Sequence, residues 1–163
     1  MKNNINSYLV RRKKGFTLIE ILVVIGIIAI LAAIVIVAIN PGRQFAQARN
    51  SQRTSNVETI INAIGQNIAD NKGIFTCGTI TLPTTATVIA SASSSSTVDL
   101  RPCLVPTYIS EMPTDPTVGI TWTGSSYSTG YTVMRDATTS RITISAPTAN
   151  TTSELNQTIS LTR

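Results

Sequence analysis

One stretch limits what this chain can fold into more than any other: residues 15–39, GFTLIEILVVIGIIAILAAIVIVAI. The 24 residues from Phe16 to Ile39 carry a single charge, on Glu20. As a helix rising about 1.5 Å per residue they extend roughly 36 Å, and the hydrocarbon core of a bilayer is about 30 Å thick. In lipid, a helix satisfies its backbone polar groups within one segment. The stretch therefore predicts a membrane-spanning helix.

Glu20 distinguishes this stretch from an ordinary membrane span. A charged residue at the centre of a membrane helix costs about 2.5–3.5 kcal/mol on insertion scales, so the carboxylate needs a partner. Cleavage between Gly15 and Phe16 would create an α-amino group four residues from Glu20. An ammonium and a carboxylate attract strongly at low dielectric. The amine of Phe16 can approach Glu20 within one helix, or between neighbouring helices, where the pair would set a stagger.

The string KKGFTLIEILVVIGIIAILAAI resembles the amino-terminal signature of type IV pilins and type II secretion pseudopilins. In that family a basic leader ends in glycine, a prepilin peptidase cuts before an apolar residue, and the new terminus is N-methylated. A glutamate at the fifth mature position is required for assembly in most members. The resemblance thus implies cleavage after Gly15, N-methylation of Phe16 and an assembly role for Glu20.

The same resemblance implies a set of partners and a location. The partners are the prepilin peptidase and methyltransferase, an inner-membrane assembly platform, the lipid bilayer and further copies of the chain in a helical filament. A plain membrane anchor would explain the hydrophobicity but not Gly15, Phe16 and Glu20 together. A secretory signal peptide, cut near Ala38, would have an apolar region of only about 7–15 residues. The pilin-like interpretation is therefore favoured over both.

The charge distribution predicts a topology. The formal net charge is +5, and the surplus bases all lie in the leader: Lys2, Arg11, Arg12, Lys13 and Lys14. Basic residues beside a span hold that end in the cytoplasm. We expect a single-pass precursor in the cytoplasmic membrane with its C-terminus outside, and an extracytoplasmic filament after assembly. Because the rest of the chain is near neutral, no nucleic-acid partner is expected for the subunit.

The two cysteines, Cys77 and Cys103, lie outside the cytoplasm by this topology and predict a disulfide. Closing a loop of about 25 residues is worth roughly 3–3.5 kcal/mol in the chain-entropy model. Two buried thiols are the alternative. The sequence contains no histidine, which excludes histidine-based catalytic triads and histidine metal sites.

The expected fold class is α+β, a long N-terminal helix packed on a small antiparallel sheet. The expected division is a basic leader at 1–15, a transmembrane and assembly helix at 16–40, an amphipathic helix at 41–73, and an extracytoplasmic loop plus antiparallel sheet at 74–163. Pro41 and Gly42 predict a helix break, because proline lacks the N–H that a helix interior needs. A boundary between lipid and water at the same place is compatible with that break.

Helical periodicity is clear in the second segment. One face carries the apolar residues, which we expect to pack on the sheet: Val57, Ile60, Ile61, Ile64 and Ile68. Arg53 is expected on another face. A weaker stripe, Phe45, Ala48 and Gln52, lies among Arg43, Arg49 and Arg53 and is expected to pack between subunits.

The rest of the sequence, from Ile74 onward, predicts a long surface connection followed by strands. The connection, Ile74 to Pro113, has short strands at Thr79–Leu82 and Thr87–Ala90 before the serine run Ser91–Ser96. Pro113-Thr114-Asp115-Pro116 resembles the turn before the terminal sheet of major pseudopilins. Alternating residues then predict an antiparallel meander at Gly119–Thr123, Tyr127–Met134, Arg141–Ala146 and Gln157–Thr162. The face expected toward the helix is Ile120, Trp122, Val133, Ile142 and Ile144.

No catalytic constellation is evident, so we expect neither an enzyme nor a cofactor, and no metal. A calcium site on Asp115 is suggested only by the pseudopilin resemblance, without an oxygen-rich loop to match it. The leading prediction is a structural, pilin-like filament subunit. The alternatives are a pseudopilin of a secretion or competence machine, and a membrane-anchored binding domain that never polymerises. A fibre that binds DNA through Arg43, Arg49 and Arg53 is a further possibility.

Overall fold

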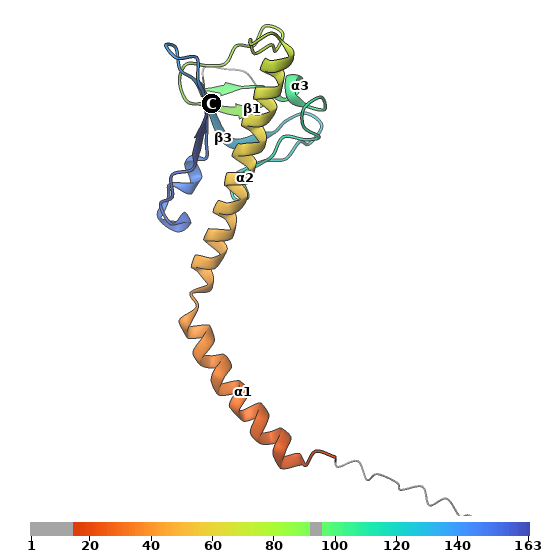
Figure 1. The fold of residues 1–163 in the computed structure, drawn as a ribbon, viewed down its shortest axis with the longest axis vertical. Helices are drawn as coiled ribbons and strands as arrows, with labels where there is room; N and C mark the ends of the chain where they lie inside the picture. The colour runs from red at the N-terminus through yellow and green to blue at the C-terminus, as the bar shows by residue number, and fades with distance from the viewer. Residues whose placement is uncertain (1–14, 92–95) are drawn as a thin grey trace, which may run out of the picture. The chain divides into compact units, whose positions relative to one another are not determined.

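The computed structural model describes residues 15–91 and 96–163, so most of the leader and four residues of the serine run lie outside it (Figure 1). The chain divides into two compact units, one ending at Asn40 and one running from Pro41 to Arg163. The first contains α1 (Leu18–Ala38), and the second contains the other described helices and the sheet. The α+β fold class predicted from the sequence is confirmed.

Helix α1 has no buried face. Every side chain described in it is exposed, and its stretch Leu18–Ile36 is long and apolar enough to cross a membrane. The helix ends at Ala38, and Ile39 is already extended, with φ −97° and ψ 110°. Helix α2 (Pro41–Asp70) begins at the proline, whose missing N–H does no harm in the first turn because that N–H has no partner within a helix.

Helix α2 packs on the sheet with the predicted apolar stripe. Val57, Ile60, Ile61 and Ile64 are buried and Ile68 is partly buried, as Figure 1 shows for the helix crossing the sheet. The stripe continues toward the N-terminus through residues that are polar or small: Ala46, Asn50 and Arg53. The expectation that Arg53 lies on another face is therefore wrong, since it lies four residues before Val57 on the same face.

Gly73 and the side chain of Asn67 together fix the C-terminal end of α2. Gly73, at φ +89°, donates its N–H to the Ile68 carbonyl at 2.8 Å, which stops the helix in a left-handed turn. Asn67 then holds the returning chain with both ends of its amide. Its Oδ1 accepts from the Thr76 N–H at 2.9 Å and its Nδ2 donates to the Thr76 carbonyl at 3.1 Å.

The sheet has five strands in the order β2-β1-β3-β4-β5. They are β1 (Thr87–Ala90), β2 (Thr97–Val98), β3 (Ser128–Arg135), β4 (Ile142–Ser145) and β5 (Ser160–Thr162). Neighbours pair antiparallel except β1 and β2, which are parallel. The sheet register shifts between Val88 and Ala90, opposite Gly130, which has φ +76°.

The strand predicted at Gly119–Thr123 is wrong. Gly119–Thr123 forms only an isolated bridge, Ile120 to Ser128, and β1 takes the place beside β3 instead. Ile120 is 55% exposed and Trp122 is 36% exposed, so neither faces the helix, whereas Val133, Ile142 and Ile144 do lie in the core. Period-two alternation shows where a segment is extended but not which strand it pairs with.

The connection from Ile74 to Pro113 is more than a surface loop. It supplies β1, β2 and the short helix α3 (Arg101–Leu104), and its buried residues Ile89, Val98, Leu100 and Leu104 belong to the core. The strand predicted at Thr79–Leu82 does not form. The disulfide Cys77–Cys103, with Cα atoms 5.2 Å apart, ties the chain after α2 to α3. Two 3₁₀ turns, η1 (Pro147–Ala149) and η2 (Thr152–Glu154), lie between β4 and β5.

Candidate functional site

Arg53 is the centre of a buried ion network. Its side chain is wholly buried, and each of its five N–H donors has an acceptor. Nε donates to Asp115 Oδ2 at 2.7 Å and Nη1 to Glu154 Oε2 at 2.7 Å. The other three donors reach, in turn, Asn50 Oδ1 at 2.8 Å, Thr117 Oγ1 at 2.8 Å and Asp115 Oδ1 at 3.2 Å. One guanidinium thus joins α2 to the proline turn and to η2.

Glu154 is bound at its side chain by two arginines and at its backbone carbonyl by an asparagine. Arg49 donates to Oε1 through Nε at 2.9 Å and through Nη2 at 2.8 Å. Asn50 Nδ2 donates to the Glu154 carbonyl at 2.7 Å. Two cations therefore meet two anions in a region where Glu154 is 4% exposed and Asp115 is 2% exposed. A buried network is tolerated only when its charges balance and its donors are satisfied.

The carboxylates of this network have shifted pKa values. Burial raises the pKa of Asp115, but the Arg53 guanidinium and the donors of Thr117 and Val118 outweigh it and hold that pKa below its ordinary value. For Glu154 the hydrogen bond from Arg49 is the largest cause, and with Arg53 it lowers the pKa against the effect of burial. Both carboxylates are therefore ionised at neutral pH.

Two glycines let the Asp115 turn approach the sheet. A Cβ on Gly130 would lie 2.8 Å from Asp115 Cβ and 2.9 Å from Val118 Cγ2. A Cβ on Gly119 would lie 2.6 Å from the backbone N and O of Asp115. The Asp115 N–H donates to the Thr129 carbonyl at 2.7 Å. The turn is thus fixed by backbone contact on one side and by Arg53 on the other.

This arrangement bears on two lesser possibilities that the sequence raised, DNA binding by the arginines and calcium binding by Asp115. Arg53 does not face solvent, and Arg49 is paired with Glu154, so neither is placed to contact DNA phosphates in the folded unit. Both oxygens of Asp115 accept bonds from a guanidinium, which occupies the place that calcium would need. Within residues 15–91 and 96–163, no group of three or more Asp, Glu, Cys or His side chains could hold a metal ion.

The start of α1 is closed by a capping box. Thr17 is the N-cap, and its Oγ1 accepts from the Glu20 N–H at 3.2 Å. The Glu20 carboxylate returns the contact, because Oε2 accepts from the Thr17 N–H at 2.7 Å and from Thr17 Oγ1 at 2.7 Å. An acid in the first turn also interacts favourably with the helix dipole. Phe16, immediately before the cap, is 84% exposed, and nothing lies within 4 Å of where a Cβ on Gly15 would be.

Residues 10–36 match the family model of the prokaryotic N-terminal methylation motif. The chain carries the prepilin signature of type IV pilins and pseudopilins. Comparison with curated proteins and with solved structures found no match. The motif covers Gly15, Phe16, Thr17 and Glu20, which the structure places at the open end of an unpartnered apolar helix.

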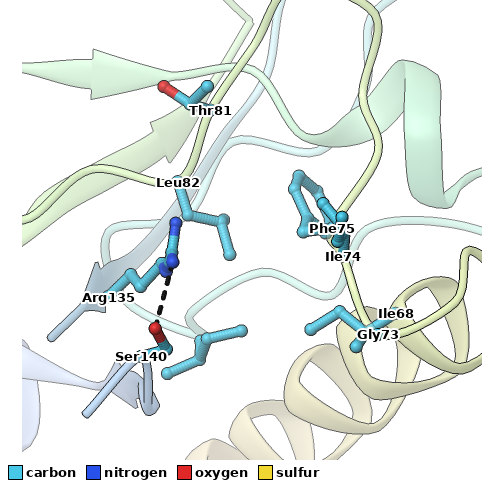
Figure 2. Close-up of a pocket in the computed structure, with 9 residues that line it drawn as sticks. Ile68, Gly73, Ile74, Phe75, Thr81, Leu82, Arg135 and Ser140 are labelled. Carbon is cyan, nitrogen blue, oxygen red and sulfur yellow. Dashed lines mark hydrogen bonds between the residues drawn. The ribbon is translucent and has the colours of Figure 1, made fainter. Parts of the chain in front are cut away.

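The chain also has a hollow of about 240 Å³ beyond the end of α2 (Figure 2). Ile68, Phe75 and Leu82 line it, and Figure 2 shows Arg135 directed toward Ser140, with Nη2 to Oγ at 3.1 Å. Its lining has no acid, cysteine or histidine. The hollow therefore contains no pair of nucleophile and base.

The sequence analysis did not predict the roles of two residues, Thr17 and Arg53. Thr17, three positions before Glu20, fits the capping-box pattern, which explains part of why an acid is tolerated there. Arg53 is at helical spacing from Val57 and Ile60 on the apolar stripe, so the pattern already placed a cation on a buried face. A buried cation requires a buried anion, and the structure supplies two, Asp115 and Glu154.

Proposed function

We propose that this chain is a structural subunit of a pilus-like filament. The precursor inserts through α1 with its leader in the cytoplasm, a prepilin peptidase cuts between Gly15 and Phe16, and the new amine is methylated. Copies then leave the membrane through an assembly platform and pack by their α1 helices. The observation that carries the proposal is the methylation motif at residues 10–36, which ends within an apolar helix that has no covered face.

In this proposal Glu20 has two roles. Within its own chain it caps α1 by accepting the two Thr17 bonds on Oε2. Between chains its negative charge neutralises the Phe16 amine of a neighbour as the subunit leaves the lipid. A lone carboxylate in a membrane costs about 2.5–3.5 kcal/mol on insertion scales, so pairing it favours assembly over remaining dispersed.

Two variants separate these roles. Glu20→Gln keeps an acceptor for Thr17 but removes the charge, and Thr17→Ala keeps the charge but removes the cap. In cells that carry a prepilin peptidase, we expect Glu20→Gln to insert and be cut yet be absent from sheared filaments. Thr17→Ala should still be incorporated. The reverse pattern would show that Glu20 is only a helix cap.

A pseudopilin of a secretion or competence machine is the second candidate, supported by one observation. The Pro113–Pro116 turn, which resembles the passage before the terminal sheet of major pseudopilins, is built into the fold through Asp115 and Arg53. Electron microscopy of sheared cell-surface material separates the candidates. Surface fibres support a pilus, and Glu20-dependent assembly without them supports a pseudopilin. A chain that is cut but never assembles would support the membrane-anchored binding domain.

A further inference from the structure

The capping box of α1 fixes where the helix begins relative to the bond proposed to be cut. The first helical residue is Leu18, and the N-cap Thr17 is extended, with φ −82° and ψ 154°. Gly15 and Phe16 precede the cap and belong to no helix. The bond between them therefore lies just outside α1, separated from its first turn by Thr17.

The backbone at that bond is accessible. Phe16 is exposed, and a Cβ built on Gly15 would have no atom within 4 Å. Among the described residues, no hydrogen bond is made by the Gly15 carbonyl or by the Phe16 N–H. The next N–H, that of Thr17, is already bound by Glu20 Oε2 at 2.7 Å. Since proteolysis concentrates where backbone is exposed and open, the bond is presented in a form that a peptidase can bind.

The sequence offers no replacement for Thr17 as the cap. From Tyr8 to Ile39 it is the one residue that is Ser, Thr, Asp or Asn, the types whose side chains cap helices best. Glycine is the next type in that order, and the first glycine before Thr17 is Gly15. A helix without its cap at Thr17 would thus begin most readily after Gly15.

That shift would hide the bond. An N-cap residue contributes its carbonyl to the first hydrogen bond of the helix. With Gly15 as N-cap, its carbonyl would accept from the N–H four residues on, and Phe16 would become the first helical residue. The carbonyl carbon that hydrolysis must attack would then lie within the hydrogen-bonded first turn.

We propose that Thr17 is a positioning residue for cleavage, because capping α1 at this point keeps the Gly15–Phe16 bond out of the helix. This role rests on the proposed processing by a prepilin peptidase. Hydrolysis breaks the bond between the Gly15 carbonyl carbon and the Phe16 nitrogen. Water supplies the hydroxyl of the new carboxyl group and the proton of the new amine. Thr17 takes no part in these bond changes and acts through the conformation of the substrate.

A positioning role of this kind has a kinetic signature. If only the chains with a helix that starts at Leu18 are bound by the peptidase, the apparent affinity falls in proportion to their fraction. Loss of an N-cap side chain shifts such an equilibrium about fivefold. KM should therefore rise by about that factor, while kcat is unchanged, because the bound substrate has the same extended backbone in either case.

The test uses the full precursor in detergent micelles with purified prepilin peptidase, and measures initial rates of conversion to the chain that begins at Phe16. Thr17→Val keeps the branched shape but removes the capping oxygen, and should raise KM about fivefold with kcat unchanged. Thr17→Asn has a different shape but restores a capping oxygen, and should return KM to within about twofold of wild type. Slower cleavage still runs to completion, so the final amount of mature chain changes little.

A second measurement needs no enzyme. The ¹³Cα chemical shift of labelled Phe16, in the same micelles, should move toward helical values in Thr17→Val and return in Thr17→Asn. An unchanged shift, a wild-type KM for Thr17→Val, or no recovery in Thr17→Asn would each overturn the positioning role and leave cleavage itself standing. A wild-type precursor that the peptidase does not cut after Gly15 would instead count against the proposed function, and the role of Thr17 would fall with it.

Discussion

Arg53 on α2 and Asp115 in the proline turn form an ion pair, Nε to Oδ2 at 2.7 Å, with both side chains wholly buried and 62 residues of sequence between them. Together with Glu154 this pair connects α2 to the turn before β3 and to the turn before β5. Three segments far apart in the sequence thus share one cation. The network ties these three segments to one another, alongside the apolar core between α2 and the sheet.

Replacing Arg53 with methionine should destabilise the fold by about 3–5 kcal/mol, because it leaves two buried carboxylates without their cation. Urea denaturation of the full chain in detergent, followed by fluorescence of the single tryptophan, Trp122, measures the free energy of unfolding. The matched control is Arg141→Met, an exposed arginine, which should change stability by no more than about 0.5 kcal/mol. Equal effects at the two positions would contradict a structural role for the buried network.

Acid should destabilise the chain through the same network. The pKa values of Asp115 and Glu154 are lower in the folded chain than their ordinary values of 3.8 and 4.5, so the unfolded chain binds more protons at acid pH. Their contribution is complete above about pH 4.5 and is lost as the pH falls through the lower, folded values. Urea denaturation at pH 7 and pH 3 should therefore show a marked loss of stability.

The Arg53→Met chain provides the comparison for that pH dependence. Glu111 and Asp136 also have lowered pKa values, from hydrogen bonds at the surface, so part of any acid effect comes from them. Without the guanidinium, the pKa values of the two buried carboxylates rise, and the variant should lose less stability than the wild type between pH 7 and pH 3. An identical loss in both chains would place the acid effect outside the network.

The helices of this chain could be predicted from sequence because their signals are local. The apolar run of α1 and the stripe Val57, Ile60, Ile61 and Ile64 repeat within a few residues. The exposure of Ile120 and Trp122 could not be predicted in this way. Their segment alternates like a strand, but the neighbour of β3 is β1, about 40 residues away in the sequence. Strand pairing depends on contacts that no short window contains.

The candidate sites also divide into one whose residues are close together in the sequence and one whose residues are far apart. Gly15, Phe16 and Glu20 lie within one short motif that the family model matches, so a local window contains all three, and their roles stay predictions. The partners of Arg53 lie 62 and 101 residues away, and only folding brings them together. Its position on the apolar stripe was visible, and it indicated that some distant acid had to be buried with it.

The disulfide should contribute substantially to stability. Cys77 and Cys103 are 26 residues apart in sequence, and closing a loop of that length is worth about 3.5 kcal/mol in the chain-entropy model. The double variant Cys77→Ala, Cys103→Ala should lose about that amount against the oxidised wild type in urea denaturation. As a control, adding reductant should destabilise the wild type and leave the double variant unchanged. If reductant has no effect on the wild type, the bond adds no stability.

Gly130 should tolerate alanine poorly. Its φ of +76° disfavours any side chain, and a Cβ would also meet Asp115 and Val118 at 2.8 and 2.9 Å. We expect Gly130→Ala to cost about 2–4 kcal/mol, from strain and overpacking together. Gly124 separates the two causes, because its φ is +93° but a Cβ added to it would have no atom within 4 Å. Gly124→Ala therefore introduces the backbone strain alone and should cost about 1–2 kcal/mol. Equal costs would mean that the approach of the Asp115 turn adds nothing.

The measurement that most directly tests the whole account is the intact mass of the chain purified from cells that carry a prepilin peptidase. The account predicts a polypeptide that begins at Phe16 and is heavier than the unmodified sequence by one methyl group, with fragmentation placing that group on the terminal nitrogen. A chain that retains residues 1–15, or one that begins beyond Ala38, would contradict it.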